Sequence, residues 1–342
     1  MTTKTKSLLP APRKIVTYAL GEDPNGGAVF LYGKPNSSSV AIFCAGFPDD
    51  HENGQVFCSR LAEENDTLVG LTCLPGFDNR PDKKWQTHKA TGYTFDEMTN
   101  AIRDAVKVVR AESTTKKAKL TGIFHDWGVA PGLIWANRSS KDENADSPDK
   151  LVLFDVLGDV HPDVKKDLPK FEKPSFFSTF VTWYYRVILA SAFALRKYVS
   201  KFIAVGCYAL GFLLIQILPI GPTLVIDDKV MAKRENAPDL FHLMYMAYPY
   251  FEMFKIAFNG GMRTFLEEYA LPKDLKNLPV LYLYGTEKRV MFHTSRAVYV
   301  LERERKEKGS KSNVIAVEGA GHWLYLQKPD ICLNEVKKFM SE

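Results

Sequence analysis

Cysteine is scarce in this sequence and follows no recognisable pattern. The chain has five cysteines, an odd number, and no two of them form a CxxC pair. This argues against a disulfide framework and against a zinc site, and it fits a reducing compartment. The chain begins with MTTKTKSLLPAPRK, which lacks the apolar segment of a secretory signal. We therefore expect an intracellular protein.

Long runs of charge of one sign are also missing. Lys and Arg number 45 and Asp and Glu number 40, and the two signs are interspersed, as in ERERKEKGSKS. Such mixing is typical of a solvated surface, and we find no nucleic-acid motif, so we expect no nucleic-acid partner. With 46% apolar residues in 342, the chain can bury a sizeable core.

What the sequence does contain is an alternation of strands and helices. Near the start, KIVTYAL and AVFLYG flank a turn-rich segment and predict a hairpin. Short apolar runs ending in Gly/Pro loops, such as SSVAIFCAGFPDD and TLVGLTCLPGFD, predict buried strands. An amphipathic helix is predicted for TFDEMTNAIRDAVKVVRAE, opened by a capping box of Thr94 and Glu97. The alternation predicts an α/β fold with a mostly parallel, twisted sheet flanked by helices.

The alternation is interrupted once. Residues 161–272 are rich in aromatic and apolar side chains and have a helical pattern, after which strands and helices resume. We therefore predict an α/β core in two parts, 1–160 and 273–342, with a strongly apolar helical cap inserted between them.

The segment GIFHDWGVAPG has the layout of a strand that turns sharply into a helix. Such a turn exposes one side chain, here Asp126, at the carboxyl edge of the sheet, and Gly128 supplies a small neighbour. The helix N-terminus favours an ionised carboxylate. A carboxylate in this place can attack an electrophilic carbon and form an ester that water then cleaves. The alternative is a buried capping aspartate.

Two loops complete the candidate site. In CAGFPDD, the backbone N–H of Phe47 is placed to form an oxyanion hole with that of Trp127. In EGAGHWLYL, His322 follows the last strand, where such a core carries its general base. The neighbouring DDH stretch, 49–51, is interpreted as a polar loop and not as a metal site.

The motifs FCAGFPDD, FHDWG and GAGHW resemble the HGFP, HDWG and GHW motifs of the α/β-hydrolase family that includes epoxide hydrolases and haloalkane dehalogenases. The resemblance covers the predicted core and is weaker in the cap. It implies that Asp126 is the nucleophile, forming an alkyl-enzyme ester, and that His322 activates the water that hydrolyses it. It implies no metal and no organic cofactor.

The sequence departs from the family at two places. The histidine of the HG pair is replaced by Ala45. After the strand LYLYG, the family's acid falls on Lys288, so the adjacent Glu287 is the first candidate for the acid that orients the histidine. Asp155 or Asp159, after the strand LVLFD, is the alternative, as in some dehalogenases, and a triad without an acid is the remaining one.

The resemblance also bears on the substrate. Halide binding in the family uses a Trp after the nucleophile, present as Trp127, and an Asn at the position of Phe47, so the sequence favours epoxides. The segment GGMRTFLEEY resembles one whose last tyrosine, here Tyr269, polarises the epoxide ring. Candidates for a second tyrosine are Tyr185, Tyr245 and Tyr248.

We therefore predict hydrolysis of a lipophilic epoxide by water. A haloalkane dehalogenase-like hydrolase on the same core is the first alternative. The second is a catalytically impaired protein that binds lipid or a membrane.

Two apolar segments, 176–195 and 202–221, together contain a single charged residue. Either, as a helix, could cross about 30 Å of hydrocarbon. A single crossing would separate Asp126 from His322, so both segments insert or neither does. We expect a shallow interfacial hairpin in 176–221, on a membrane facing the cytosol, with lysines at the headgroups. The alternative is a cytoplasmic protein with a lipophilic cap, and both predict a lipophilic substrate.

Overall fold

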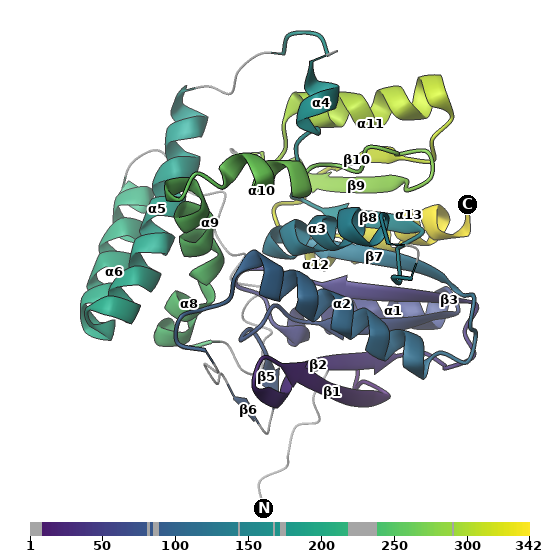
Figure 1. Ribbon diagram of the computed structural model, residues 1–342, viewed down its shortest axis with the longest axis horizontal. Coiled ribbons are helices and arrows are strands. Elements are labelled where there is room, and N and C mark those ends of the chain that lie inside the picture. The colour runs from purple at the N-terminus through teal and green to yellow at the C-terminus, as the bar shows by residue number, and fades with distance from the viewer. Residues whose placement is uncertain are drawn as a thin grey trace, which may run out of the picture.

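The centre of the fold is an eight-stranded sheet (Figure 1) with the strand order β1-β2-β4-β3-β7-β8-β9-β10. The computed structural model describes residues 9–80, 83–84, 89–142, 144–166, 168–171, 176–217, 238–288 and 291–342. The strands of the sheet are β1 Lys14–Leu20, β2 Asp23–Tyr32, β3 Ser39–Cys44, β4 Thr67–Thr72, β7 Lys119–His125, β8 Lys150–Phe154, β9 Val280–Gly285 and β10 Asn313–Val317. Two short strands, β5 Asn79–Arg80 and β6 Lys83–Lys84, pair separately.

Most of the sheet is parallel, as predicted. The strands β4, β3, β7, β8, β9 and β10 pair with their neighbours in parallel. The predicted hairpin is present, since β1 pairs antiparallel with β2, and β2 pairs antiparallel with β4. Parallel strands end at one edge of the sheet, so the segments that follow β7, β8, β9 and β10 lie side by side.

Helices cover both faces of the sheet. One core cluster packs α2, α3 and α11 on one face, and a second packs α1, α12 and α13 on the other. Their bounds are α1 His51–Glu64, α2 Phe95–Glu112, α3 Val129–Ser139, α11 Ser295–Lys308, α12 Leu324–Gln327 and α13 Pro329–Ser341. The predicted capping box is confirmed at the start of α2: the Thr94 hydroxyl accepts from Glu97 N–H, and the Glu97 carboxylate accepts from Thr94 N–H.

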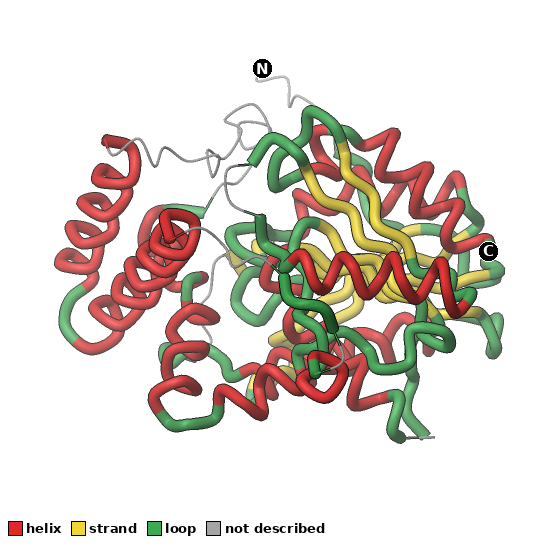
Figure 2. Tube along the Cα trace, turned by 90° about the horizontal axis from the view of Figure 1, so that it is seen from above, coloured by secondary structure: helices red, strands yellow, loops and turns green. Residues whose placement is uncertain are grey.

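Between β8 and β9 the chain forms a group of helices. These are α4 Pro162–Lys165, α5 Phe176–Tyr198, α6 Lys201–Ile217, α8 Leu240–Met246, α9 Tyr248–Phe258 and α10 Met262–Glu268. Figure 1 places α5, α6, α8 and α9 at one end of the sheet, and Figure 2 shows helices in the same place from above. The division of the chain at residues 160 and 272 stays a prediction.

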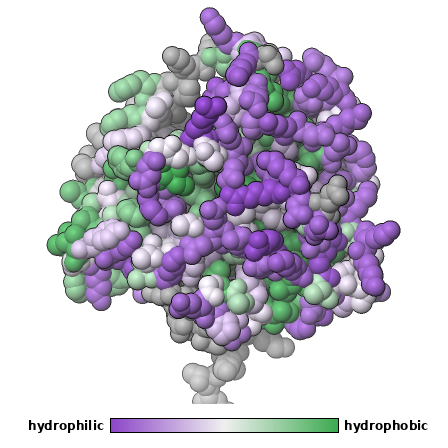
Figure 3. Space-filling model, viewed as in Figure 1, coloured by the Kyte–Doolittle hydropathy of each residue, from purple (hydrophilic) through white to green (hydrophobic). Residues whose placement is uncertain are grey.

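The two apolar segments form α5 and α6, which pack against each other closely. A Cβ on Gly211 would lie 2.5 Å from Ile188 Cδ1. Among the residues that the structure describes, no helix has the length and apolar character needed to cross a membrane. The end of the second segment, 218–221, lies outside the described residues. Figure 3 shows hydrophobic side chains gathered on the side of α5 and α6, and mostly hydrophilic ones over α2 and α11.

Candidate active site

The strand β7 ends at His125 and the chain then turns sharply at Asp126. Asp126 has a φ of 50°, in the left-handed region that costs a non-glycine residue about 1–2 kcal/mol. A short 3-10 helix, Asp126–Gly128, leads into α3. A Cβ on Gly128 would lie 2.3 Å from Cys44 O, so this position requires glycine. The turn therefore has the strained geometry expected of a residue held out at the edge of a sheet.

The predicted oxyanion loop lies against Asp126. The backbone N–H of Phe47 donates a 2.7 Å hydrogen bond to Asp126 Oδ1. Gly46 permits this approach, because a Cβ there would lie 2.1 Å from Trp127 N and 2.5 Å from Asp126 Oδ1. Of the two predicted donors, the Phe47 N–H binds this carboxylate oxygen, and Trp127 N lies against Gly46 in the same turn.

His322 lies between two carboxylates. Its Nε2 is 3.3 Å from Asp126 Oδ2, and its Nδ1 is 2.5 Å from Asp155 Oδ2. The rings of Phe292 and Trp323 pack against the imidazole, and the side chain is only 4% exposed. Asp126, His322 and Asp155 are thereby joined in one row.

The electrostatics of the row favour a protonated imidazole. Burial alone would oppose the charge on His322. The hydrogen bonds and charges of Asp126 and Asp155 outweigh burial and raise the pKa of His322 from 6.5 to about 9. The pKa of Asp155 is lowered: burial opposes its ionisation, but the charges of Lys288 and His322 and its hydrogen bonds with both prevail.

The residue that contacts His322 is Asp155, and the first candidate, Glu287, does not lie there. Glu287 is exposed, and its backbone N–H donates to Ala320 O at 2.8 Å. This backbone contact turns its side chain to solvent and turns the next side chain, Lys288, inward. The preference for Glu287 was therefore wrong in geometry, because two adjacent residues after β9 point in opposite directions.

Asp159, the other alternative, belongs to a different ion-pair group. Its carboxylate accepts from Arg296 Nε and Lys165 Nζ, both at 2.7 Å, and from the Thr294 hydroxyl at 2.9 Å. These contacts tie the loop after β8 to α4 and α11. Of the two aspartates named as alternatives, Asp155 therefore contacts His322, and Asp159 binds groups of other elements.

A buried network ties the loops of the site together, and the sequence analysis did not anticipate it. His125 Nδ1 lies 3.2 Å from Asp49 Oδ2, and its Nε2 lies 3.1 Å from His322 O. The indole N–H of Trp323 donates to Asp49 Oδ1 at 2.9 Å. Asp49, which the sequence analysis placed in a polar loop, therefore fastens the loop after β3 to the loop after β10.

Two tyrosines, one on α5 and one on α9, form a pair near Asp126. The hydroxyls of Tyr185 and Tyr250 share a 2.5 Å hydrogen bond. The Tyr250 ring packs edge-on against Trp127 at 4.8 Å and Phe47 at 5.7 Å. Burial, with the Asp126 charge contributing, raises the pKa of both phenols. Tyr250 was not among the predicted residues, and its neighbours in the sequence give no periodic signal that separates it from Tyr245 or Tyr248.

Those two tyrosines have another role. The hydroxyl of Tyr245 donates to Lys89 O at 3.1 Å, and that of Tyr248 donates to Pro75 O at 3.0 Å. Both hydroxyls therefore anchor α8 and α9 to the core instead of facing the nucleophile. Of the three candidates for the second tyrosine, the structure places only Tyr185 in the site.

Tyr269 ends α10, and its ring stacks on Phe265 at 5.6 Å. Burial raises its pKa; Arg186 opposes this rise and the charge of Asp126 adds to it. The direct ring contact of Tyr269 in the described part of the chain is thus with Phe265 of α10, and its role as the ring-polarising tyrosine stays a prediction.

The architecture around this site matches that of solved structures. A protein from Klebsiella pneumoniae assigned as an epoxide hydrolase has a TM-score of 0.61 at 15% identity, over 96% of this chain and 98% of its own. A loop variant of a haloalkane dehalogenase from Bradyrhizobium elkanii has a TM-score of 0.58 at 13% identity, over 96% of each chain. A Bacillus megaterium epoxide hydrolase has a TM-score of 0.55 at 17% identity, over 96% of this chain and 100% of its own.

The chain has the α/β-hydrolase fold. No family model and no curated protein matches its sequence. At identities of 17% and below, these likenesses show the fold alone, and the chemistry has to be argued from the side chains of the site.

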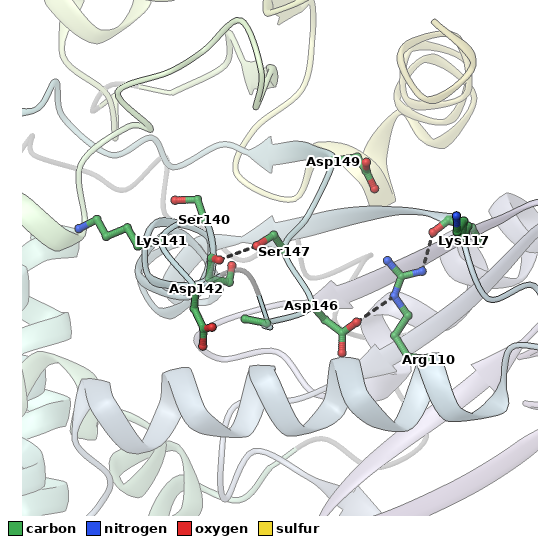
Figure 4. A pocket seen from close by; sticks show the side chains of 11 residues that line it. Arg110, Lys117, Ser140, Lys141, Asp142, Asp146, Ser147 and Asp149 are labelled. Atoms are coloured by element: carbon green, nitrogen blue, oxygen red, sulfur yellow. Dashed lines mark hydrogen bonds and ion pairs between the residues drawn. The ribbon is translucent and has the colours of Figure 1, made fainter.

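A separate cavity of about 540 Å³ opens at the other edge of the sheet, beside the loop between α3 and β8 (Figure 4). Several of the polar groups that line it form ion pairs or hydrogen bonds with one another. Arg110 lies 3.5 Å from Asp146, and the Ser147 hydroxyl donates to Ser139 O at 2.6 Å. Because it lies where β7 and β8 begin and Asp126 lies where β7 ends, we assign it no part in the site.

The two candidate acids can be separated by titrating His322 in histidine-labelled protein by NMR. We expect Asp155→Asn to lower the pKa of His322 from about 9 by at least about one unit, because a direct carboxylate partner is lost. Glu287→Gln, at an exposed position, is the control and should leave it unchanged. The reverse pattern would contradict the assignment of Asp155.

Unfolding gives a second readout of the same group. The folded-state pKa lies above the ordinary value, so this stabilisation is complete below pH 6.5 and is lost as the pH rises through about 9. In the wild type, the free energy of unfolding should therefore fall as the pH rises from 6.5 to about 9. Asp155→Asn should make this decrease smaller, as measured by unfolding in denaturant at several pH values.

Proposed function

We propose that this protein hydrolyses a lipophilic epoxide to a diol through an ester on Asp126. The observation that carries the proposal is the row Asp126, His322 and Asp155, with the Phe47 N–H on the opposite oxygen of Asp126. Oδ1 is held by the backbone N–H of Phe47 at 2.7 Å, and Oδ2, which has the longer contact with His322 at 3.3 Å, is the oxygen that attacks. This division of roles suits a carboxylate nucleophile.

In the first step, Asp126 Oδ2 attacks a ring carbon and the carbon–oxygen bond of the ring breaks. The departing oxygen takes a proton from a cap tyrosine, so the products are an ester and a tyrosinate that is reprotonated from solvent. The raised pKa values of Tyr185, Tyr250 and Tyr269 keep these phenols protonated before the attack. A halide leaves without a proton, so three phenols around the nucleophile favour the epoxide over the haloalkane.

In the second step, neutral His322 takes a proton from water, and the hydroxide adds to the ester carbonyl. The negative charge develops on Oδ1, where the N–H of Phe47 already points. Collapse of this intermediate breaks the ester bond, restores the Asp126 carboxylate and releases the diol. Forming the ester also removes one of the two carboxylate charges that raise the pKa of His322. The protonated imidazole therefore loses its proton to solvent more easily, and the neutral form is available as the base for the second step.

The ester can be tested directly by one turnover of styrene oxide or a fatty epoxide in ¹⁸O-water, followed by peptide mass spectrometry. We expect ¹⁸O in the Asp126 carboxylate after turnover, because water attacks the ester carbonyl. His322→Gln should accumulate an alkyl ester on the peptide that contains Asp126, with the hydrolysis step slowed by about 10²-fold or more. Label in the diol but not in the peptide would contradict an Asp126 nucleophile, and halide release from haloalkanes alone would favour a dehalogenase.

The tyrosines can be assigned by Tyr→Phe variants that remove only a hydroxyl. We expect Tyr185→Phe, Tyr250→Phe and Tyr269→Phe each to lower the rate of ester formation from an epoxide by about tenfold or more, because proton donation to the ring oxygen is impaired. Tyr245→Phe and Tyr248→Phe are matched controls whose hydroxyls bind loop carbonyls. Loss of ester formation in the controls alone would overturn the assignment.

We also propose that α5 and α6 dock on an anionic lipid surface. Their apolar face comprises exposed side chains on both helices: Phe176, Phe180, Trp183, Phe202, Ile203, Leu210 and Leu213. Residues 176–217 contain four basic residues and no Asp or Glu. A second copy of such a face would be repelled by its own charge, whereas anionic headgroups would be attracted. Since α5 also carries Tyr185, this contact would bring the site close to lipophilic substrates.

Binding to vesicles tests this contact. We expect the protein to sediment with vesicles of phosphatidylserine and phosphatidylcholine, and more weakly with phosphatidylcholine alone. The double variant Trp183→Ser/Phe202→Ser should lose binding, because it removes apolar area from the face. Ile15→Ser, at a 44% exposed residue of β1, is the control. Binding that survives the double variant, or self-association through this face, would contradict the proposal.

A further inference from the structure

A buried lysine lies behind the acid of the row. Lys288 Nζ contacts Asp155 Oδ1, and the side chains of the pair are only 2% and 0% exposed. The other oxygen of the same carboxylate lies 2.5 Å from His322 Nδ1. Ammonium, carboxylate and imidazole therefore follow one another in a buried line.

Placing an ammonium here is costly. Burial lowers the pKa of Lys288, and only Asp155 opposes that shift. A buried ion pair often contributes little net stability to a fold. We therefore look for a role of the Lys288–Asp155 pair other than stabilisation. Lys150 offers a comparison, because its buried ammonium donates to the backbone carbonyls of Phe339 and Met340 and serves the packing of α13. Lys288 differs in that its partner is the acid of the site.

Two other histidines, His293 and His125, lie near this line in the described part of the chain. His293 contacts the Tyr282 hydroxyl at 2.8 Å, and burial and the charge of Lys288 lower its pKa to about 4, so it is neutral near pH 7. The Tyr282 hydroxyl donates to Asp155 O at 3.1 Å. On the opposite side, the ring of His125 lies 4.6 Å from that of His322.

His125 in turn has a partner of its own, the buried carboxylate of Asp49 at 3.2 Å. The charges that act most strongly on His322 are thus those of Asp126 and Asp155, and the charge of Lys288 acts on Asp155.

We infer that Lys288 is a positioning residue that offsets the charge of Asp155, so that His322 releases its proton once Asp126 has become an ester. The inference rests on the proposed function. In the resting protein, two carboxylates balance the lysine and a protonated imidazole. When the ester forms, one negative charge disappears and the line carries an excess positive charge, which favours deprotonation of His322.

Without the lysine, the balance would differ at that same stage. A protonated His322 and an ionised Asp155 would form a neutral buried ion pair. Such a pair would hold the proton and delay the base. Lys288 therefore acts on the hydrolysis step and not on the attack by Asp126.

The test combines Lys288→Gln, Lys288→Met and the control Lys150→Met. Gln keeps an N–H donor for Asp155 but loses the charge, so a purely structural role would leave Gln like the wild type. We expect both Lys288 variants to raise the pKa of His322 in the resting protein, measured by NMR, by about one unit or more. Lys150→Met, which removes a buried lysine that donates to the backbone carbonyls of Phe339 and Met340, should leave it unchanged.

The second readout is the pH dependence of single turnovers. For the Lys288 variants, the pH at which ester hydrolysis reaches half its maximum should rise by the same amount, while the rate of ester formation near pH 7 changes less than about threefold. An unshifted His322 and an unshifted hydrolysis profile in Lys288→Gln would overturn the inference.

A different result would bear on the proposed function alone. If the wild type forms no ester, that function fails, while the NMR titration still decides whether Lys288 acts on His322. If an unpaired Asp155 prevents the Lys288 variants from folding, the comparison moves to Asp155→Asn, with and without Lys288→Gln. There too the lysine should lower the pKa of His322 by about one unit, and no difference would overturn the inference.

Discussion

The position of the His322 imidazole between two carboxylates is the constraint on which the rest of the site depends. Asp126, Asp155, Lys288 and His322 follow β7, β8, β9 and β10, which are consecutive neighbours in the sheet. Parallel pairing brings all four strand ends to one edge, so residues far apart in the sequence meet within hydrogen-bonding distance. A change in strand order would separate the row.

Holding the two carboxylates in place requires an unfavourable backbone. Asp126 and Asp155 have φ values of 50° and 65°, both in the left-handed region. The surroundings maintain these conformations: the loop carrying Phe47 closes on Asp126, and Lys288 and the Gly285 N–H bind Asp155. Strain at two carboxylates of one site is consistent with selection for chemistry instead of stability.

The cap has two faces with different characters. Toward the core, Tyr185 and Tyr250 bring hydroxyls together beside Trp127. Away from the core, α5 and α6 present exposed apolar side chains without any acidic residue between 176 and 217. One helix, α5, contributes to both, which links the proposed chemistry to a lipophilic source of substrate.

The parts of the site that lie in local turns could be predicted from the sequence. Asp126, Phe47 and His322 each lie in the segment that follows a predicted strand, where neighbouring residues specify the conformation, and the capping box of α2 is local in the same way. The contact of Asp155 with His322 and the pairing of Tyr250 with Tyr185 could not be predicted from the sequence, because both depend on the tertiary structure. Glu287 and Lys288 are adjacent, and only the contact between the loops after β9 and β10 turns one outward and the other toward Asp155. Likewise, the packing of α9 on Trp127 distinguishes Tyr250 from Tyr248. No pattern along the chain does so, because contacts between distant segments leave no local signal.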